Sequence, residues 1–250
     1  MTRPQSPDLS PPLAGEAESD TRERLLFVAM RYFALYGING VALKTISEAA
    51  GSRNKSAVGY HFSSKRGLVE AVLQRLHDDL APQMTAVLDR YERKLDSGDE
   101  VIIDEVVLEL LTPILRLYAS ASYGPDGVRV LARMMHDPID AAPLGLRQSL
   151  GRLTGRSIAL LHRLLPRKRR ADVQHHVHHA LMATVNGLAL HQQFVSGAGV
   201  QWTDAPPAEL FLSYVGYVVA GLAGGPLNID PATLASWTAR LQAPRLSAVS

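Results

Sequence analysis

The chain has 250 residues, which is enough for one large domain or for a small domain followed by a larger one. Hydrophobic residues make up 46% of it, so a sizeable core is expected. The absence of cysteine excludes disulfides and thiolate metal sites and fits a reducing cytoplasm. The first residues lack the apolar core of a signal peptide. The longest apolar stretch, 210–225, is broken by glycines and falls short of the roughly 20 residues that a membrane span needs.

Charge is unevenly distributed along the chain, although the formal net charge is only +2. Residues 21–80 hold nine basic and five acidic side chains, whereas residues 1–20 hold one basic and four acidic side chains. The positive excess is therefore gathered in one short segment, where a polyanion could bind. A solvated surface explains the same bias without any partner, so the charge alone leaves both interpretations open.

Apolar residues follow helical spacing, and no alternating strand pattern is found. Residues 1–20 hold four prolines and almost no large apolar side chain, so we expect a disordered tail. A helix over about 21–36 is followed by short helices over about 43–50 and from about Asn54. A long helix begins after Ser64, and Pro82 is expected to kink or end it. Further helices are expected near 101–119, 125–137, 144–165, 171–196, 207–223 and 231–241, with a bend at Pro113.

Residues 42–62 contain two short helices that meet at a turn with Gly51. A helix-turn-helix has this arrangement, in which the first helix braces on the DNA backbone and the second places its N-terminal side chains in the major groove. The helix N-terminus itself favours phosphate, and Asn54 is well suited to cap it. The second helix begins with polar and basic side chains, namely Arg53, Asn54, Lys55 and Ser56.

Three segments here resemble the TetR family of repressors in their order and spacing: Phe33–Gly37, Thr45–Gly51, and Tyr60–Lys65 followed by Gly67 and Leu68. The resemblance extends over about residues 21–77. It implies an all-α fold of about nine or ten helices, with a three-helix DNA-binding domain over 21–67 and a helical ligand-binding and dimerisation bundle over 68–242. It also implies repression from a palindromic operator that a small ligand releases, because the ligand binds only one spacing of the two DNA-binding heads.

The resemblance assigns DNA contacts residue by residue. Lys65 matches the family's basic residue at the start of the fourth helix, and Lys44 matches a second-helix position that often faces DNA. The turn before the third helix, around Ser52, is one residue longer than the commonest family pattern. Gly59 stands where the family usually has a phosphate-contacting tyrosine, and that role is carried to Tyr60. The predicted DNA-binding set is Lys44, Thr45, Arg53, Asn54, Lys55, Ser56, Tyr60, His61 and Lys65.

An apolar ligand pocket is predicted in the C-terminal bundle, because methionine, aromatic and histidine side chains recur there at helical spacing. The same side chains would also serve as plain core. The candidates are Tyr118, Met134, Met135, His162, His191 and Phe194.

A two-fold homodimer is predicted from the helices near 171–196 and 207–223. The first helix has an apolar stripe and a second face of small residues that includes Ala180, Ala183 and Gly187. The second helix is apolar nearly all round and therefore needs partners on more than one side. A monomeric core is the alternative. The interface candidates are Val177, Leu181, Leu188, Phe211, Tyr214 and Val218.

Two further clusters admit more than one interpretation. The histidines within 175–179 have spacing that suits a metal, but a wet helix face or a subunit contact is simpler. The basic run 167–170 with Arg163 either contacts DNA or forms a solvated corner. No catalytic motif is found, so we expect no enzymatic activity, cofactor or metal. The expected partners are double-stranded DNA, a small effector and a second copy of the chain, without a membrane. The rival functions are a ligand-independent DNA-binding protein and a metal-dependent enzyme that uses the histidines.

Overall fold

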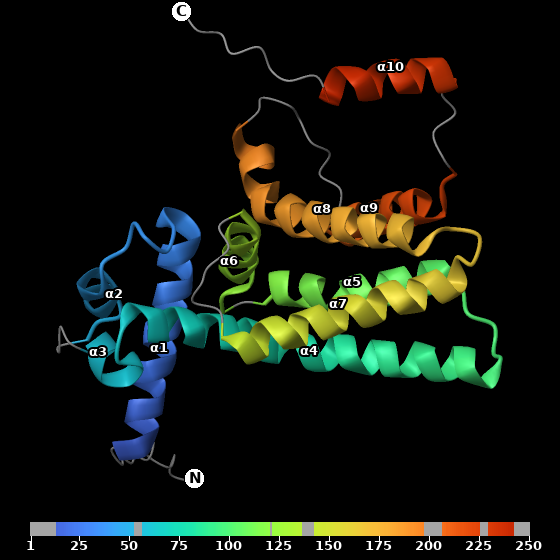
Figure 1. The fold of residues 1–250 in the computed structure, drawn as a ribbon. Coiled ribbons are helices and arrows are strands. Elements are labelled where there is room, and N and C mark those ends of the chain that lie inside the picture. Colours follow the sequence, from blue (N-terminus) through green and yellow to red (C-terminus); the bar gives the residue numbers. More distant parts are fainter. Residues whose placement is uncertain are drawn as a thin grey trace, which may run out of the picture.

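The computed structural model describes residues 14–52, 57–120, 122–136, 143–197, 207–225 and 230–242. Within these ranges it holds ten α-helices and no strand, which confirms the predicted all-α fold. None of the described helices is both long and apolar enough to cross a membrane. The helices (Figure 1) are α1 (Ala14–Tyr36), α2 (Leu43–Ala49), α3 (Ala57–Phe62), α4 (Lys65–Ser97), α5 (Ile103–Tyr118), α6 (Gly124–His136), α7 (Leu144–Leu164), α8 (Arg170–Gly197), α9 (Pro207–Ala223) and α10 (Pro231–Gln242).

One helix starts earlier than predicted, and another continues past a proline at which the sequence left both a kink and an end open. α1 begins at Ala14, so the last part of the predicted tail is helical, while residues 1–13 lie outside the described residues. The segment 14–19 holds two alanines and two glutamates, which are good helix formers, and acidic side chains are favourable near a helix N-terminus. α4 does not end at Pro82 but continues to Ser97. The hydrogen bond lost at the proline is offset because α4 packs along α5 and α7.

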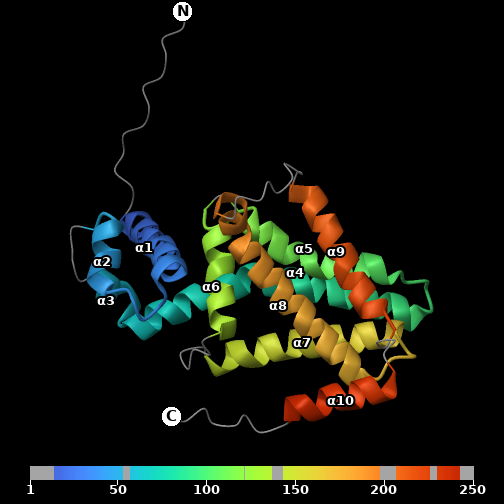
Figure 2. The ribbon, with the colours of Figure 1, turned by 90° about the horizontal axis from the view of Figure 1, so that it is seen from above.

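α1, α2, α3 and the beginning of α4 form an N-terminal unit at one end of the molecule (Figures 1 and 2). All four helices contribute side chains to its core, and each of those named next is at most 1% exposed. They are Leu25 and Phe33 from α1, Ile46 from α2, Val58 from α3 and Leu68 from α4. Burial of side chains this large contributes roughly 1.5–3 kcal/mol each, which is how such short helices as α2 and α3 are held.

The rest of α4 leaves this unit and forms one side of a helical body, with α5 and α7 packed against it (Figure 1). α6 packs against α1, α5 and α8, and α9 packs against α5 and α8 (Figure 2). One buried cluster runs from the N-terminal unit into the body and includes Val128 of α6 and Val185 of α8. A second cluster joins α4, α5, α7, α8 and α9 around Leu88 and Leu160. The N-terminal unit and the near end of the body therefore share one core.

Candidate nucleic-acid interface and internal cavity

α2 and α3 meet at a tight turn. Gly51 has a φ of 69°, a left-handed conformation that glycine adopts without steric cost. Backbone hydrogen bonds close the end of α2, from Ala50 N to Ile46 O at 3.0 Å and from Ser52 N to Ser47 O at 3.1 Å. Ile46 and Ser47 point into the core. Residues 53–56, which include the predicted Arg53, Asn54, Lys55 and Ser56, lie outside the described residues.

The turn between α3 and α4 is sterically specific. A Cβ atom on Gly67 would lie 2.1 Å from the Phe62 carbonyl oxygen, so only glycine fits there. Ser64 caps α4 by accepting a hydrogen bond from Gly67 N at 3.1 Å. The Lys65 ammonium donates to the Asn39 carbonyl oxygen at 3.4 Å, which joins the start of α4 to the loop between α1 and α2. α3 and the first turn of α4 are therefore held in one fixed relation.

The other predicted DNA-contacting side chains that are described lie on the surface of this unit. Tyr60 is 72% exposed, and its ring meets His61 edge to face with centroids 5.0 Å apart. Thr45 is exposed, and Lys44 lies 3.8 Å from Glu48 in an i,i+4 pair open to solvent. Such exposed pairs contribute little to stability, so Lys44 can exchange its partner for a phosphate at small cost.

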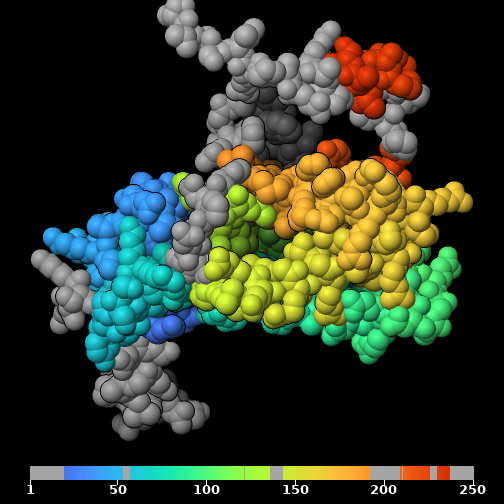
Figure 3. All heavy atoms as spheres, viewed as in Figure 1, coloured from blue at the N-terminus to red at the C-terminus, as the bar shows by residue number. Residues whose placement is uncertain are grey.

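A cavity of about 310 Å³ lies in the half of the body that is closer to the N-terminal unit, and it is lined by α4, α5, α6, α7 and α8. A hollow between α6, α7 and α8 is visible on the face shown in Figure 3. Of the predicted pocket residues, Met134 and Met135 line the cavity. Sequence reasoning missed its other side chains, which come mainly from the inner faces of α4, α5 and α7, such as His77, Leu111 and Thr154.

Of the four remaining pocket candidates, the three whose side chains are described do not line the cavity. Tyr118 packs against the first core cluster, and the His162 ring lies 3.1 Å from the Lys168 carbonyl oxygen beyond the far end of α7. His191 is half-buried on α8 and does not line the cavity, and the Phe194 side chain lies outside the described residues. Spacing along one helix places these side chains on inward faces, but only packing between helices decides which of them meet.

The N-terminal unit is attached to the body by a few specific contacts. The Arg133 guanidinium of α6 donates to the carbonyl oxygens of Ala34 and Leu35 at 3.0 and 3.1 Å, at the C-terminal end of α1. Positive charge is favourable at that end of a helix. Arg75 of α4 reaches Glu23 of α1 at 3.3 Å and the Tyr123 hydroxyl at 3.2 Å. Arginine side chains therefore join α1 to both α6 and α4.

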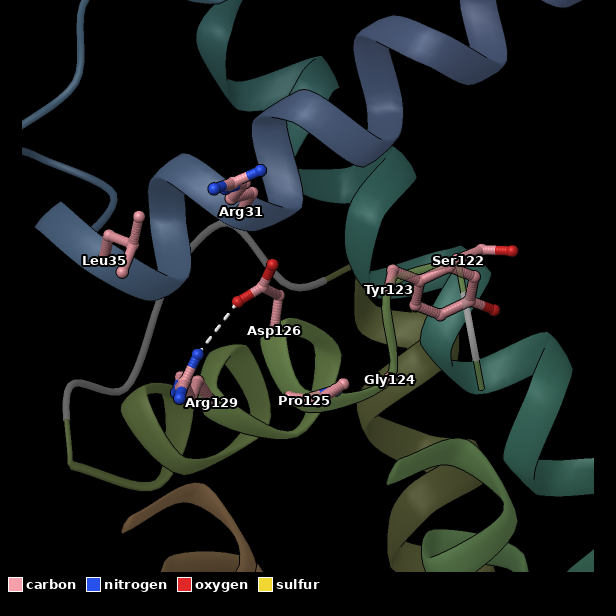
Figure 4. Close-up of a pocket in the computed structure, with 8 residues that line it drawn as sticks. All are labelled: Arg31, Leu35, Ser122, Tyr123, Gly124, Pro125, Asp126 and Arg129. Carbon is pink, nitrogen blue, oxygen red and sulfur yellow. Dashed lines mark hydrogen bonds and ion pairs between the residues drawn. The ribbon is translucent and has the colours of Figure 1, made fainter. Parts of the chain in front are cut away.

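An open, polar hollow of about 380 Å³ lies beside these contacts, between α1 and the start of α6 (Figure 4). Arg31 and Leu35 line it from α1, and Asp126 and Arg129 line it from α6, where they form an ion pair of 3.1 Å. The close-up shows that the ion pair stays within α6. The contact between the N-terminal unit and this end of α6 is thus partly open.

Most of the predicted interface residues face the core of their own chain. Val218 is 5% exposed, and Val177, Phe211 and Tyr214 pack around the same cluster, while Leu188 packs against the other cluster. Burial raises the pKa of Tyr214, whose hydroxyl donates to the Ala180 carbonyl oxygen at 2.9 Å. Leu181 is 36% exposed and lines the cavity. Val218 thus lies where α9 packs on α5 and α8 of the same chain, and its contact with a second copy stays a prediction.

The histidine and basic clusters have local partners. His176 is half-buried, and this burial is the main cause that lowers its pKa. Repulsion by the positive charge of Lys168 lowers the pKa further. No group of three metal-ligating side chains is found among the described residues. In the basic cluster, Arg163 pairs with Asp96 at 2.8 Å, Arg169 pairs with Asp172 at 2.7 Å, and Lys168 donates to the Gly224 carbonyl oxygen. These contacts favour the interpretation of a solvated corner between helices.

Comparisons with known proteins agree with this geometry. Residues 25–72 match the sequence model of the bacterial regulatory proteins of the tetR family. No curated protein matches the chain. Among solved structures, the TetR family transcriptional regulator PfmR from Thermus thermophilus is 16% identical, over 82% of this chain and 100% of that chain, with a TM-score of 0.54. A HlyIIR mutant protein with a linker containing thrombin sites is 14% identical, over 83% and 100%, with a TM-score of 0.52.

The fold and the helix-turn-helix define a DNA-binding regulator built only of helices in its described part. The likeness to PfmR and HlyIIR concerns the fold alone, since the identities are low. The sequence match is more specific, because it begins in α1 and ends in α4 and so spans the complete helix-turn-helix. Residues 25–72 therefore match the tetR family of bacterial regulatory proteins, and the helical fold of the chain is similar to that of PfmR.

Proposed function

We propose that the protein is a sequence-specific transcriptional repressor that leaves a palindromic operator when a small molecule binds in its body. The observation that carries this proposal is the tetR-family helix-turn-helix of α2 and α3, which lies at one end of the molecule. The exposed side chains of Lys44, Thr45 and Tyr60, with His61 and Lys65, are its proposed DNA contacts. The side chains of residues 53–56 complete the proposed set of DNA contacts. Phosphate contacts would fix the position on the duplex, and base contacts would select the sequence.

The proposed dimer uses the outer face of α8 and α9. On α9, Leu212 is 58% exposed and Tyr217 is 71% exposed, whereas Val218 of the same helix is buried; large apolar side chains exposed together often mark a contact with a partner. Gly187, Gly216 and Gly221 lie on the exposed surface of these helices, and a Cβ atom on any of them would meet nothing within 4 Å. A glycine inside a helix costs about 1 kcal/mol against alanine. No neighbour in the described chain requires these glycines, so we attribute them to the close approach of a second copy.

The surface around these residues fits the same arrangement. Met182 and Leu190 of α8 are 38% exposed, and α9 is apolar along most of its length. In Figure 1 α10 stands away from the body, and its residues 231–236 are all exposed. An isolated helix of this length is marginal in water, so a partner chain would stabilise it. A symmetric contact of α8 and α9 would place two DNA-binding units against half-sites one helical turn or more apart.

The proposed coupling between cavity and DNA runs through α4 and α6. Leu131 and Met134 of α6 line the cavity, while Arg133 of the same helix holds the end of α1. Leu73 and Leu76 of α4 line the cavity from a helix whose first turn carries Lys65. A ligand that favours one placement of these helices would shift the spacing of the two DNA-binding units and lower operator affinity.

We further propose the domain boundaries 21–67 for DNA binding and 68–242 for ligand binding and dimerisation, preceded by a tail over 1–20. We propose that the protein has no catalytic activity, since its family match is to regulatory proteins. It would act in the cytoplasm, where bacterial operators lie.

A selection experiment tests the proposed function. The full chain is incubated with a random pool of duplex DNA, and the retained fragments are sequenced. We expect one palindromic sequence to be enriched, and its binding to weaken steeply as salt rises, because lysine and arginine contacts release counterions. A folded Lys44, Lys55 and Lys65 triple-alanine variant should lose that binding. Retention without any enriched sequence would contradict sequence-specific regulation, and unchanged affinity of the triple variant would contradict the proposed interface.

A further inference from the structure

We propose that the cavity in the body binds an uncharged, largely hydrocarbon molecule that carries one hydrogen-bonding group, directed at Thr154. The inference rests on the proposed ligand-released regulator and names the class of ligand that the cavity accepts.

The described part of the cavity wall has no lysine, arginine, aspartate or glutamate, and seventeen of its twenty described lining residues are apolar. The only titratable side chain among these twenty is His77, whose ring nitrogens lie 2.9 Å from the Ser149 hydroxyl and 3.5 Å from the Asp78 carboxylate. Moving an ionised group from water into such surroundings is strongly unfavourable unless a partner compensates it. A carboxylate, phosphate or ammonium ligand therefore finds no counter-charge here.

Two threonines are the other polar side chains of the wall, and they differ in their partners. The Thr184 hydroxyl already bonds to the Ala180 carbonyl oxygen at 2.7 Å and to the Tyr214 hydroxyl at 2.8 Å. The Thr154 hydroxyl is half-buried in the wall and has no hydrogen-bond partner among the described residues. A bound ligand would shield this hydroxyl from water. Because a shielded hydroxyl costs free energy when it is left unpaired, a ligand that bonds to Thr154 is favoured over one that does not.

The shape of the cavity favours an elongated ligand. A smaller apolar hollow of about 90 Å³ shares Met84, Leu111 and Thr154 with it and continues to Val218 on α9. At about 30 Å³ for each water-sized group, the main cavity holds roughly ten such groups. Thr154 lies where the two hollows meet, so a chain could extend from it in either direction.

The opening of the cavity is apolar as well. Leu150 of α7 and Leu181 of α8 line the cavity and remain 43% and 36% exposed. Large apolar side chains at the mouth of a hollow favour the approach of a hydrophobic molecule from solvent.

The test uses two fluorescent probes that differ mainly in charge, N-phenyl-1-naphthylamine, which is neutral, and 8-anilinonaphthalene-1-sulfonate, which is anionic. The full chain is titrated with each probe without DNA. The neutral probe should bind saturably, at one site per chain, and the anionic probe at least tenfold more weakly. A straight-chain alcohol of about ten carbons should displace the neutral probe, and the carboxylate of the same length should fail to do so. Equal affinity for the charged and uncharged members of either pair would overturn the proposal.

Two variants locate the site. Leu111→Trp fills the junction of the two hollows and should abolish saturable binding, whereas Leu144→Trp, on an exposed leucine of α7 outside the cavity, should leave it unchanged. Thr154→Val keeps the volume of the side chain and serves if Leu111→Trp fails to fold. It should weaken binding of the alcohol about two- to tenfold, because one hydrogen bond is lost. Alcohol binding that is unaffected by Thr154→Val would refute the role of the hydroxyl.

The proposal on the ligand class and the proposed repressor function fail in different ways. If the neutral ligand binds in the cavity but leaves operator binding unchanged, the ligand class stands and regulation by this cavity is wrong. If a charged molecule displaces the operator and the neutral probes do not bind, regulation stands and the ligand class is wrong.

Discussion

Replacement of Arg133 by methionine tests the attachment of the DNA-binding unit to the body. Methionine keeps most of the aliphatic stem but removes both hydrogen bonds to the carbonyl oxygens of Ala34 and Leu35. Hydrogen bonds from a charged group are worth about 1.5–3 kcal/mol each when shielded. Because Arg133 is largely exposed, we expect a smaller total loss of about 1–2 kcal/mol in the free energy of unfolding. In a chain of this size that corresponds to a fall in Tm of roughly 2–8 °C.

The assay compares urea unfolding of Arg133→Met with that of Arg152→Met. Arg152 is an exposed arginine of α7 without a hydrogen bond or ion pair to the described residues, so its loss should change stability by less than about 0.5 kcal/mol. Hydrogen exchange should also quicken in the last turn of α1, where the Arg133 contacts end, and not in α7. Equal stability of the two variants, or unchanged exchange in α1, would refute the claim that Arg133 holds the N-terminal unit.

Four further substitutions probe the interface, the α3–α4 turn and the histidine cluster. Leu212→Glu should give a folded monomer by light scattering, while Val218→Asp should destabilise the chain itself, because it buries a charge in the core; a folded dimer of Leu212→Glu contradicts the proposed interface. Gly67→Ala should cost about 1–3 kcal/mol in urea unfolding because of the Phe62 carbonyl oxygen, and wild-type stability would contradict this. Because the pKa of His176 is lowered in the folded chain, the unfolded chain binds more protons than the folded chain as pH falls below about 6.5. The free energy of unfolding should therefore fall in that range, and it should fall by a smaller amount in His176→Gln. If the free energy of unfolding depends on pH identically in the wild-type chain and in His176→Gln, His176 is excluded as the cause.

The helices and the helix-turn-helix could be predicted from the sequence because their signals are local. Apolar spacing identifies α1, and Gly51 marks the turn that needs a left-handed residue. The beginning of α1 could not be predicted in the same way, and the sequence left open whether α4 passes through Pro82 or ends there. Tertiary packing of α4 against α5 and α7 compensates the proline, and that packing is invisible in the local pattern.

The outer surface of α8 and α9 shows a second limit to what could be predicted from the sequence. The most apolar stripe of α9, which includes Val218, packs within the chain. The sequence alone does not distinguish this from a contact with a partner, because both kinds of burial require apolar side chains. The distinguishing signal is the absence of intramolecular neighbours at Gly216 and Gly221 among the described residues, which only a three-dimensional structure reveals. The sequence did indicate a small-residue face with Gly187, and that face is exposed.

The cavity was partly accessible to sequence reasoning. Met134 and Met135 lie on one short helix whose inner face can be read from spacing, and both line the cavity. His77 and Thr154 lie on α4 and α7, far apart in the chain, and no sequence pattern joins them. The distribution of partners between Thr154 and Thr184 depends on Tyr214 of α9, which no local pattern places beside them.

The most direct test of ligand-released DNA binding is the operator affinity of the full chain with and without the neutral ligand. The duplex enriched in the selection is titrated at fixed salt, first alone and then with the alcohol at a concentration that saturates the cavity. Coupling energies between sites in regulatory proteins are about 1–3 kcal/mol. We therefore predict a roughly 5- to 150-fold loss of operator affinity, which Leu111→Trp prevents. An operator affinity that stays constant while the cavity fills would contradict the account.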